Sequence, residues 1–132
     1  MSQMRWGWIV GVAVAAEILG VLVLVALVAA FGPPGFEAAT PFAQRLGQWV
    51  GPISGFVLCG AGGYWVARGA IEARIANGVG VGIAGAVLDL ATGFALGGTL
   101  NLLATVSNLG RVIGGTLGGW LATRAGGRGG LP

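Results

Sequence analysis

Four long apolar segments account for most of this chain: residues 6–31, 46–67, 75–96 and 100–123. A helix rises about 1.5 Å per residue, so about 20 residues cross the ~30 Å hydrocarbon core of a bilayer. Each of the four segments is long enough to do so. We therefore predict an all-α fold in which residues 1–132 form a single polytopic membrane domain, with four transmembrane helices and a flexible tail over residues 124–132.

The composition favours a membrane location. Hydrophobic residues make up 55% of the chain and charged residues 8%, whereas an ordinary soluble domain has about 25% charged residues. The apolar content is also too high for a disordered chain. The first segment exceeds the roughly 7–15 apolar residues of a cleaved signal peptide, so we expect it to remain as the first helix.

The residue types that are missing exclude several kinds of site. The chain has no His and a single Cys, Cys59, so His-dependent catalysis and multi-thiolate metal sites are excluded. We therefore expect no enzymatic activity, no cofactor and no bound metal. The seven basic residues are all Arg and are dispersed along the chain. They do not form the basic patch that nucleic-acid binding requires, so we expect no nucleic-acid partner.

The charges between the segments predict the orientation. Gly32–Gly35 ends the first helix, and residues 32–48 are predicted to form the one sizeable loop on that side, with Arg45 as its only basic residue. The basic residues of the other side are Arg5, Arg68, Arg74, Arg124 and Arg128. By the positive-inside rule, both termini are predicted to be cytoplasmic. The Arg-only, Ala- and Gly-rich usage is typical of a GC-rich bacterial genome, so we expect the bacterial inner membrane.

The chain has 28 Gly residues, and many of them recur at four-residue spacing on the last three segments. Residues four apart share one helix face. Because lipid gives helices no hydrophobic drive to associate, such GxxxG ridges of small residues are expected to pack helices closely. The predicted packing positions are Gly51, Gly55, Cys59, Gly63, Gly85, Gly93, Gly110, Gly114 and Gly118. The ridges exceed what one four-helix bundle needs, which favours a homo-oligomer or a larger membrane-protein partner.

Three charged residues, Glu17, Asp89 and Arg111, fall within the apolar segments. A charge at mid-membrane costs about 2.5–3.5 kcal/mol on insertion scales, so such residues usually pair or face water. We predict that Arg111 bridges to Asp89, to Glu17 or to both, with Asp89 favoured because a hairpin brings the third and fourth helices together. Ser107 and Asn108 share the Arg111 face and are predicted to line this intramembrane charge cluster with polar groups.

The cluster has two carboxylates and one guanidinium, which leaves two interpretations open. In the first, the cluster is a structural polar core, in which one carboxyl group is ion-paired and the other is protonated or bonded to water. In the second, the less well paired carboxylate, expected to be Glu17, is a proton- or cation-linked site.

Two resemblances bear on these interpretations. The whole chain resembles small bacterial four-helix integral membrane proteins, through Gly62-Gly63-Tyr64, Arg68, Arg74, Asn77-Gly78 and Trp120; this resemblance implies a fold but no activity. Residues 16–20, Ala-Glu-Ile-Leu-Gly, are similar to the first helix of the small multidrug-resistance transporters. That resemblance implies that Glu17 couples protons to cationic substrates, although Asp89 and Arg111 depart from that family's pattern.

From these observations we expect a structural or accessory membrane component that acts through helix–helix packing. The alternative is a small proton- or cation-linked transporter or channel built on the Glu17, Asp89 and Arg111 cluster.

Overall fold

The computed structural model describes residues 4–127, all of them helical apart from short turns. Its four helices are α1 (Trp6–Phe31), α2 (Phe36–Arg68), α3 (Arg74–Ala95) and α4 (Leu102–Gly127). The first three are long and apolar enough to cross a membrane, which identifies the chain as a membrane protein with a four-helix, all-α fold. Helix α4 has 26 residues but is not among those three.

Helix α2 begins ten residues earlier than predicted, at Phe36 rather than residue 46. The prediction of a long loop over residues 32–48 is therefore wrong, and the turn between α1 and α2 needs only Gly32–Gly35. Gly35 has a φ of +92°, a left-handed backbone conformation that glycine adopts readily and that lets the chain reverse. The Glu37 carboxylate lies in the first turn of α2, where it complements the positive end of the helix dipole. The helix then continues through Pro41.

Hydrogen bonds cap both helix ends at the turn between α3 and α4. Gly97 has a φ of +80°, its N–H donates to Phe94 O at 3.0 Å, and Gly98 N–H donates to Gly93 O at 2.8 Å. This is the hydrogen-bond pattern of a Schellman motif. The Asn101 side chain then caps α4, because its Oδ1 accepts a hydrogen bond of 2.8 Å from Ala104 N–H.

Helix α4 also ends later than predicted. Residues 124–127, which the sequence analysis assigned to a flexible tail, continue α4 to Gly127. The rest of that predicted tail, residues 128–132, lies outside the described residues.

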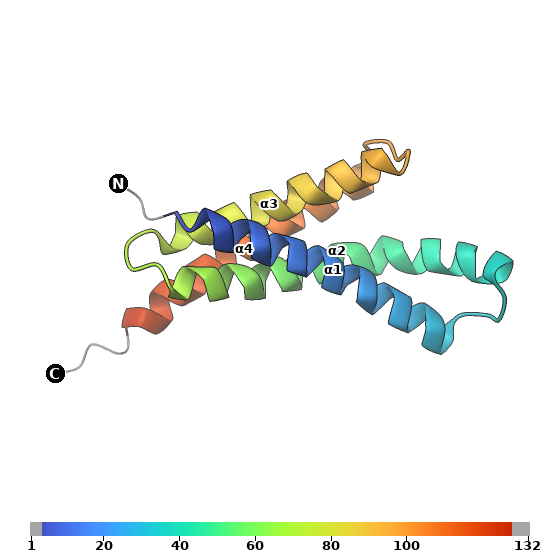
Figure 1. Ribbon diagram of the computed structural model, residues 1–132, viewed down its shortest axis with the longest axis horizontal. Helices are drawn as coiled ribbons and strands as arrows, with labels where there is room; N and C mark the ends of the chain where they lie inside the picture. Colours follow the sequence, from blue (N-terminus) through green and yellow to red (C-terminus); the bar gives the residue numbers. More distant parts are fainter. Residues whose placement is uncertain (1–3, 128–132) are drawn as a thin grey trace.

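The two hairpins form a fork. Figure 1 shows the helices close together at the end that holds the α2–α3 loop, whereas the α3–α4 hairpin diverges from the α1–α2 hairpin toward the opposite end. Within residues 4–127, no Cα atom of α1 lies within 8 Å of a Cα atom of α4. Helix α4 instead packs against α2 and α3, and α1 covers α2 and α3 from the other side.

Glycines bring α4 into backbone contact with its two neighbours. Gly114 and Gly118 face α2 so closely that a Cβ at either position would overlap a carbonyl oxygen, that of Phe56 or of Gly60. On the adjacent ridge, a Cβ at Gly119 would lie 2.9 Å from Arg74 O of α3. Such approach gives the van der Waals contact that holds helices together in lipid.

The predicted packing residues have different surroundings in the structure. Gly63, Gly114 and Gly118 lie at close helix contacts, while Gly110 meets only Phe56 Cβ at 3.9 Å. Gly55 and Gly85 lie beside the Arg111 side chain, and Cys59 lies against Gly85, as described below. A Cβ at Gly51 or Gly93 would meet nothing within 4 Å in the described chain, so these two positions do not pack helices closely here, contrary to expectation. Gly93 lies where the hairpins have already diverged.

Gly118→Ala should destabilise the bundle, because the added Cβ overlaps the α2 backbone and the helices must separate. We expect a loss of about 1–3 kcal/mol in the free energy of unfolding, as for other overpacked sites. The measurement is denaturant unfolding of the purified protein in mild detergent. Gly110→Ala, two turns away on the same ridge, is the matched control, and it should be neutral or stabilising by up to about 1 kcal/mol. Equal effects of the two substitutions would contradict the close-packing interpretation.

Candidate functional site

Arg111 lies at the centre of the bundle and is the most completely paired charge in the structure. The whole residue is 4% exposed. Nε donates to Glu17 Oε1 at 2.9 Å, Nη2 donates to Glu17 Oε2 at 3.2 Å and to Asp89 Oδ1 at 2.9 Å, and Nη1 donates to Ser107 Oγ at 2.7 Å. The structure thus brings together the three charged residues that the sequence placed at membrane depth. The bridge joins α4 to both α1 and α3.

The two carboxylates are not equivalent. Glu17 receives two hydrogen bonds from Arg111 in a bidentate contact, which is the stronger geometry for an arginine–carboxylate pair. Asp89 receives one bond from Arg111, and its Oδ2 accepts a second bond of 3.0 Å from Asn108 Nδ2. Both acids lie 2.9 Å from Arg111, but Glu17 takes two of its bonds and Asp89 one. The expectations that Arg111 prefers Asp89 and that Glu17 is the less well paired acid are therefore wrong.

The predicted polar residues complete the cluster. Ser107 Oγ lies one turn before Arg111 and accepts its Nη1 bond. Asn108 connects Asp89 to the α4 backbone, since its Nδ2 also donates to Ala104 O at 2.8 Å. The Asn108 Oδ1 atom is buried and accepts no hydrogen bond from the described residues, so one acceptor beside Asp89 is unsatisfied.

Two glycines leave the space that the Arg111 side chain fills. A Cβ at Gly55 of α2 would lie 2.9 Å from Arg111 Cζ, and a Cβ at Gly85 of α3 would lie 3.6 Å from Arg111 Cδ. Cys59 is 1% exposed, and its Sγ would lie 2.9 Å from that same Gly85 Cβ. The ridge pattern predicts only helix packing for these residues, whereas in the structure Gly55 and Gly85 also accommodate Arg111. The available signal was their position on the ridges at the depth of the charges.

A cavity of about 290 Å³ reaches the cluster from the diverging end of the fork. Glu17 and Asp89 lie at its inner limit, and the α3–α4 turn, including Thr99, forms its outer part. The side chains of Glu17 and Asp89 are 25% and 33% exposed, whereas that of Arg111 is 5% exposed. The carboxylates thus face the cavity, and the guanidinium lies behind them.

The charges and the donor types limit what this arrangement can do. With both carboxylates ionised, the cluster carries one net negative charge, which a proton or a small cation in the cavity would neutralise. Within residues 4–127, no group of three His, Cys, Asp or Glu side chains lies close enough together to hold a metal ion. Compared with known protein families, with curated proteins and with solved structures, this chain matches none.

Arg111→Gln should destabilise the protein strongly, because it leaves two carboxylates close together without their counter-charge. We expect a loss of about 3 kcal/mol, the lower end of the range for removing one member of a buried ion pair, since both carboxylates keep access to the cavity. Arg45→Gln makes the same change of charge at an exposed position of α2 and should leave stability unchanged. Detergent unfolding of the two variants measures the difference. Equal stability of Arg111→Gln and the unsubstituted protein would show that the ion pairs do not hold the bundle.

Proposed function

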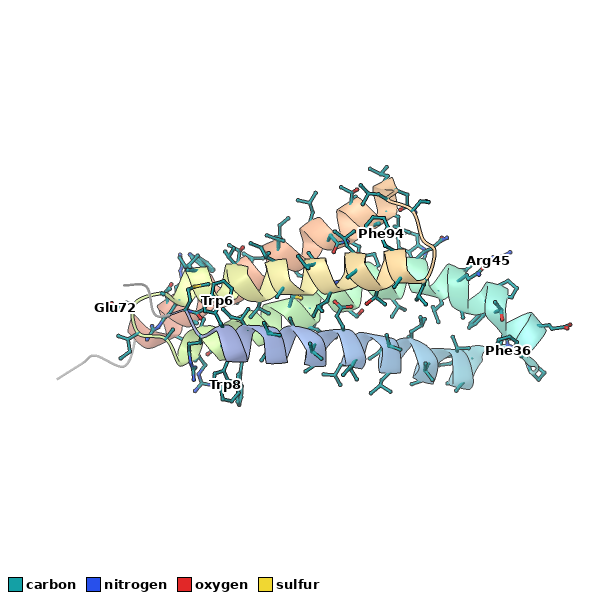
Figure 2. All side chains as sticks on the ribbon, turned by 45° about the horizontal axis from the view of Figure 1, so that its top comes forward. Trp6, Trp8, Phe36, Arg45, Glu72 and Phe94 are labelled. Carbon is teal, nitrogen blue, oxygen red and sulfur yellow. The ribbon has the colours of Figure 1, made fainter. Side chains whose placement is uncertain are left out.

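We propose that all four helices span the membrane and that the end bearing the α2–α3 loop is cytoplasmic. Figure 2 supports this arrangement, with Glu72, Trp6 and Trp8 at one end and Arg45, Phe36 and Phe94 toward the other. Arg5, Arg68, Arg74 and Arg124 all belong to the first end, whereas the second carries Arg45 and Glu37. An arginine excess of this kind marks the cytoplasmic side of bacterial inner-membrane proteins.

The distribution of side chains on α4 supports a fourth span despite its polar content. Its polar residues Ser107, Asn108 and Arg111 are buried against α2 and α3. Apart from Arg124 in its last turn, its exposed large side chains are apolar, namely Leu102, Leu103, Val106, Leu109, Ile113, Leu117, Trp120 and Leu121. A helix that turns its polar groups inward and an apolar face outward can lie in lipid even when its mean hydropathy is low.

We further propose that the protein is a small proton- or cation-linked transporter or channel with its binding site at Glu17 and Asp89. The observation that carries this proposal is the cavity that ends on both carboxylates, where the net charge is negative. Ionisable groups inside a membrane protein typically mark proton or ion pathways when they contact a cavity.

The geometry indicates how the two acids divide the work. Asp89 is the more exposed and has one bond from Arg111, so a proton or cation entering the cavity binds there first. Arg111 retains its bidentate contact with Glu17 while Asp89 is neutralised. Glu17 is released only if Arg111 breaks its two bonds to this carboxylate. Occupancy of the site is therefore coupled to the contact between α1 and α4.

Glu17→Gln and Asp89→Asn should each abolish the activity. The measurement is proton flux into vesicles that contain the purified protein and a pH-sensitive dye, driven by an imposed membrane potential. We expect flux in the unsubstituted protein and only the rate of protein-free vesicles in both variants, because neither amide can take up a proton. Glu37→Gln, at the exposed start of α2, changes the same charge outside the cavity and should keep full flux. Flux that is absent in every protein, or unchanged in both variants, refutes the transport proposal.

A structural or accessory role is the second candidate, and the exposed surface of α1 favours it. Only Ile9, Ala13 and Ala16 of this helix are buried, and a Cβ at Gly7 or Gly11 would meet nothing within 4 Å. Most of the other glycine ridges are occupied within the chain, so the case for a partner rests on this face.

Purification in mild detergent tests the accessory role directly. If α1 packs against a second copy or a larger membrane protein, the mass of the complex should exceed that of one chain in detergent, with a fixed stoichiometry. Gly11→Leu should disrupt that complex, because the bulky side chain prevents close helix approach. Gly51→Leu makes the same change on α2, where an added Cβ meets nothing within 4 Å in the described chain, and is the control that leaves the α1 face intact. A monomer under all conditions contradicts this role.

A further inference from the structure

A second cavity, of about 320 Å³, lies at the end of the bundle opposite the fork opening. It is lined by Arg5, Trp8, Trp65, Arg68 and Gly69, and we refer to it as the Arg–Trp cavity. Arg5 immediately precedes α1, and Arg68 is the last residue of α2. Both arginines therefore line the cavity where one helix begins and another ends.

The arginines of the Arg–Trp cavity have unused hydrogen-bond donors, whereas Arg74 and Arg111 donate to atoms of the bundle. Arg74 donates to the carbonyls of Ala70 at 3.0 Å and Ala122 at 3.2 Å. Among the described residues, the Arg5 side chain makes one long bond of 3.5 Å to Val66 O, and Arg68 donates no hydrogen bond. Neither is within 4 Å of a carboxylate in residues 4–127, so two positive charges share one cavity without a counter-charge.

Both guanidinium groups are nevertheless held in place. Arg5 Cζ lies 5.3 Å from the Trp8 ring centroid. The backbone N–H of Arg5 donates to Asn77 Oδ1 at 2.9 Å. Arg68 Cζ lies 5.7 Å from the Tyr64 ring centroid. Both distances are typical of cation–π contacts, which orient a cation without neutralising it.

Gly69 provides the space in which the Arg5 guanidinium lies. A Cβ at this position would overlap Arg5 Nη1, although the Gly69 φ of −82° is open to any residue. Glycine at position 69 therefore makes room for Arg5 and is not required by the backbone conformation.

We propose that the Arg–Trp cavity binds the phosphate of an anionic phospholipid. Guanidinium groups suit phosphate oxygens because their planar N–H donors can form paired hydrogen bonds. The exposed rings of Trp8 (53%) and Trp65 (61%) flank the arginines, and Trp prefers the level of the lipid headgroups. A free phosphate ion would use the arginines alone, whereas a lipid also places its glycerol and upper acyl chains along these two rings.

The test measures lipid binding to the purified protein by native mass spectrometry in mild detergent. The probes are phosphatidylglycerol, phosphatidylcholine and inorganic phosphate. We expect phosphatidylglycerol to bind more tightly than phosphatidylcholine. Arg5→Gln and Arg68→Gln should each weaken phosphatidylglycerol binding about fivefold, the effect of one basic residue near an anionic lipid.

Two further variants separate a defined site from general charge attraction. Arg124→Gln removes the same charge from the same end, at a residue that stacks on Trp120 and does not line the cavity, so it should bind phosphatidylglycerol as the unsubstituted protein does. Gly69→Ala keeps every charge but displaces Arg5, and it should weaken binding. Arg68→Gln removes no hydrogen bond within the described chain, so its fold should persist.

Three results would overturn the proposal. Equal weakening in Arg124→Gln and Arg68→Gln would show that any arginine at this end serves. Binding that is unchanged in Arg5→Gln and Arg68→Gln would remove the arginines from the site. Inorganic phosphate that displaces phosphatidylglycerol at similar concentration would identify the occupant as a free anion rather than a lipid.

Discussion

The permanent positive charge of Arg111 determines how the four helices fit together. A guanidinium inside a bundle of this kind is costly unless it is paired with strong acceptors, and here Glu17, Asp89 and Ser107 accept hydrogen bonds from all three of its nitrogens. Because α1 and α4 have no backbone contact, the side-chain bridge from Arg111 to Glu17 is their direct connection. The contact between α1 and α4 therefore depends on an ion pair, whereas α4 meets α2 and α3 through close backbone packing.

Glycine serves both of these interactions. Toward the tightly packed end of the bundle, Gly114 and Gly118 bring the α4 backbone against α2. At the level of Arg111, Gly55 and Gly85 instead leave room for a long side chain between helices. Small residues on three helices thus have two roles, close backbone packing and room for the Arg111 side chain. Both occur near Arg111, because a Cβ at Gly82 of α3 would lie 2.6 Å from the Arg111 carbonyl oxygen.

The two ends of the molecule consequently differ in chemistry. At the diverging end, a cavity exposes two carboxylates whose counter-charge is buried behind them, and this arrangement supports the uptake of a proton or cation. At the tightly packed end, two arginines without counter-charges face a Trp-lined cavity that suits a lipid phosphate. The two sites have opposite charge. One lies at the start of α1 and the other reaches Glu17 near the middle of that helix, so a lipid held at Arg5 would anchor the helix whose Glu17 contacts Arg111.

The sequence by itself determined the helices and the depth of the charges, because apolar length and hydropathy are local properties. It identified the α1 boundaries, the three charged residues and their mutual pairing. It misplaced the start of α2. The turn Gly32–Gly35 and the early Pro41 of the helix have the same local sequence character as the beginning of a longer loop. Tertiary structure alone decided that Glu17 takes the bidentate contact, that Gly55 and Gly85 house Arg111, and that Gly51 and Gly93 stay open. These outcomes depend on the angle between the hairpins, which is set by contacts between residues far apart in the chain.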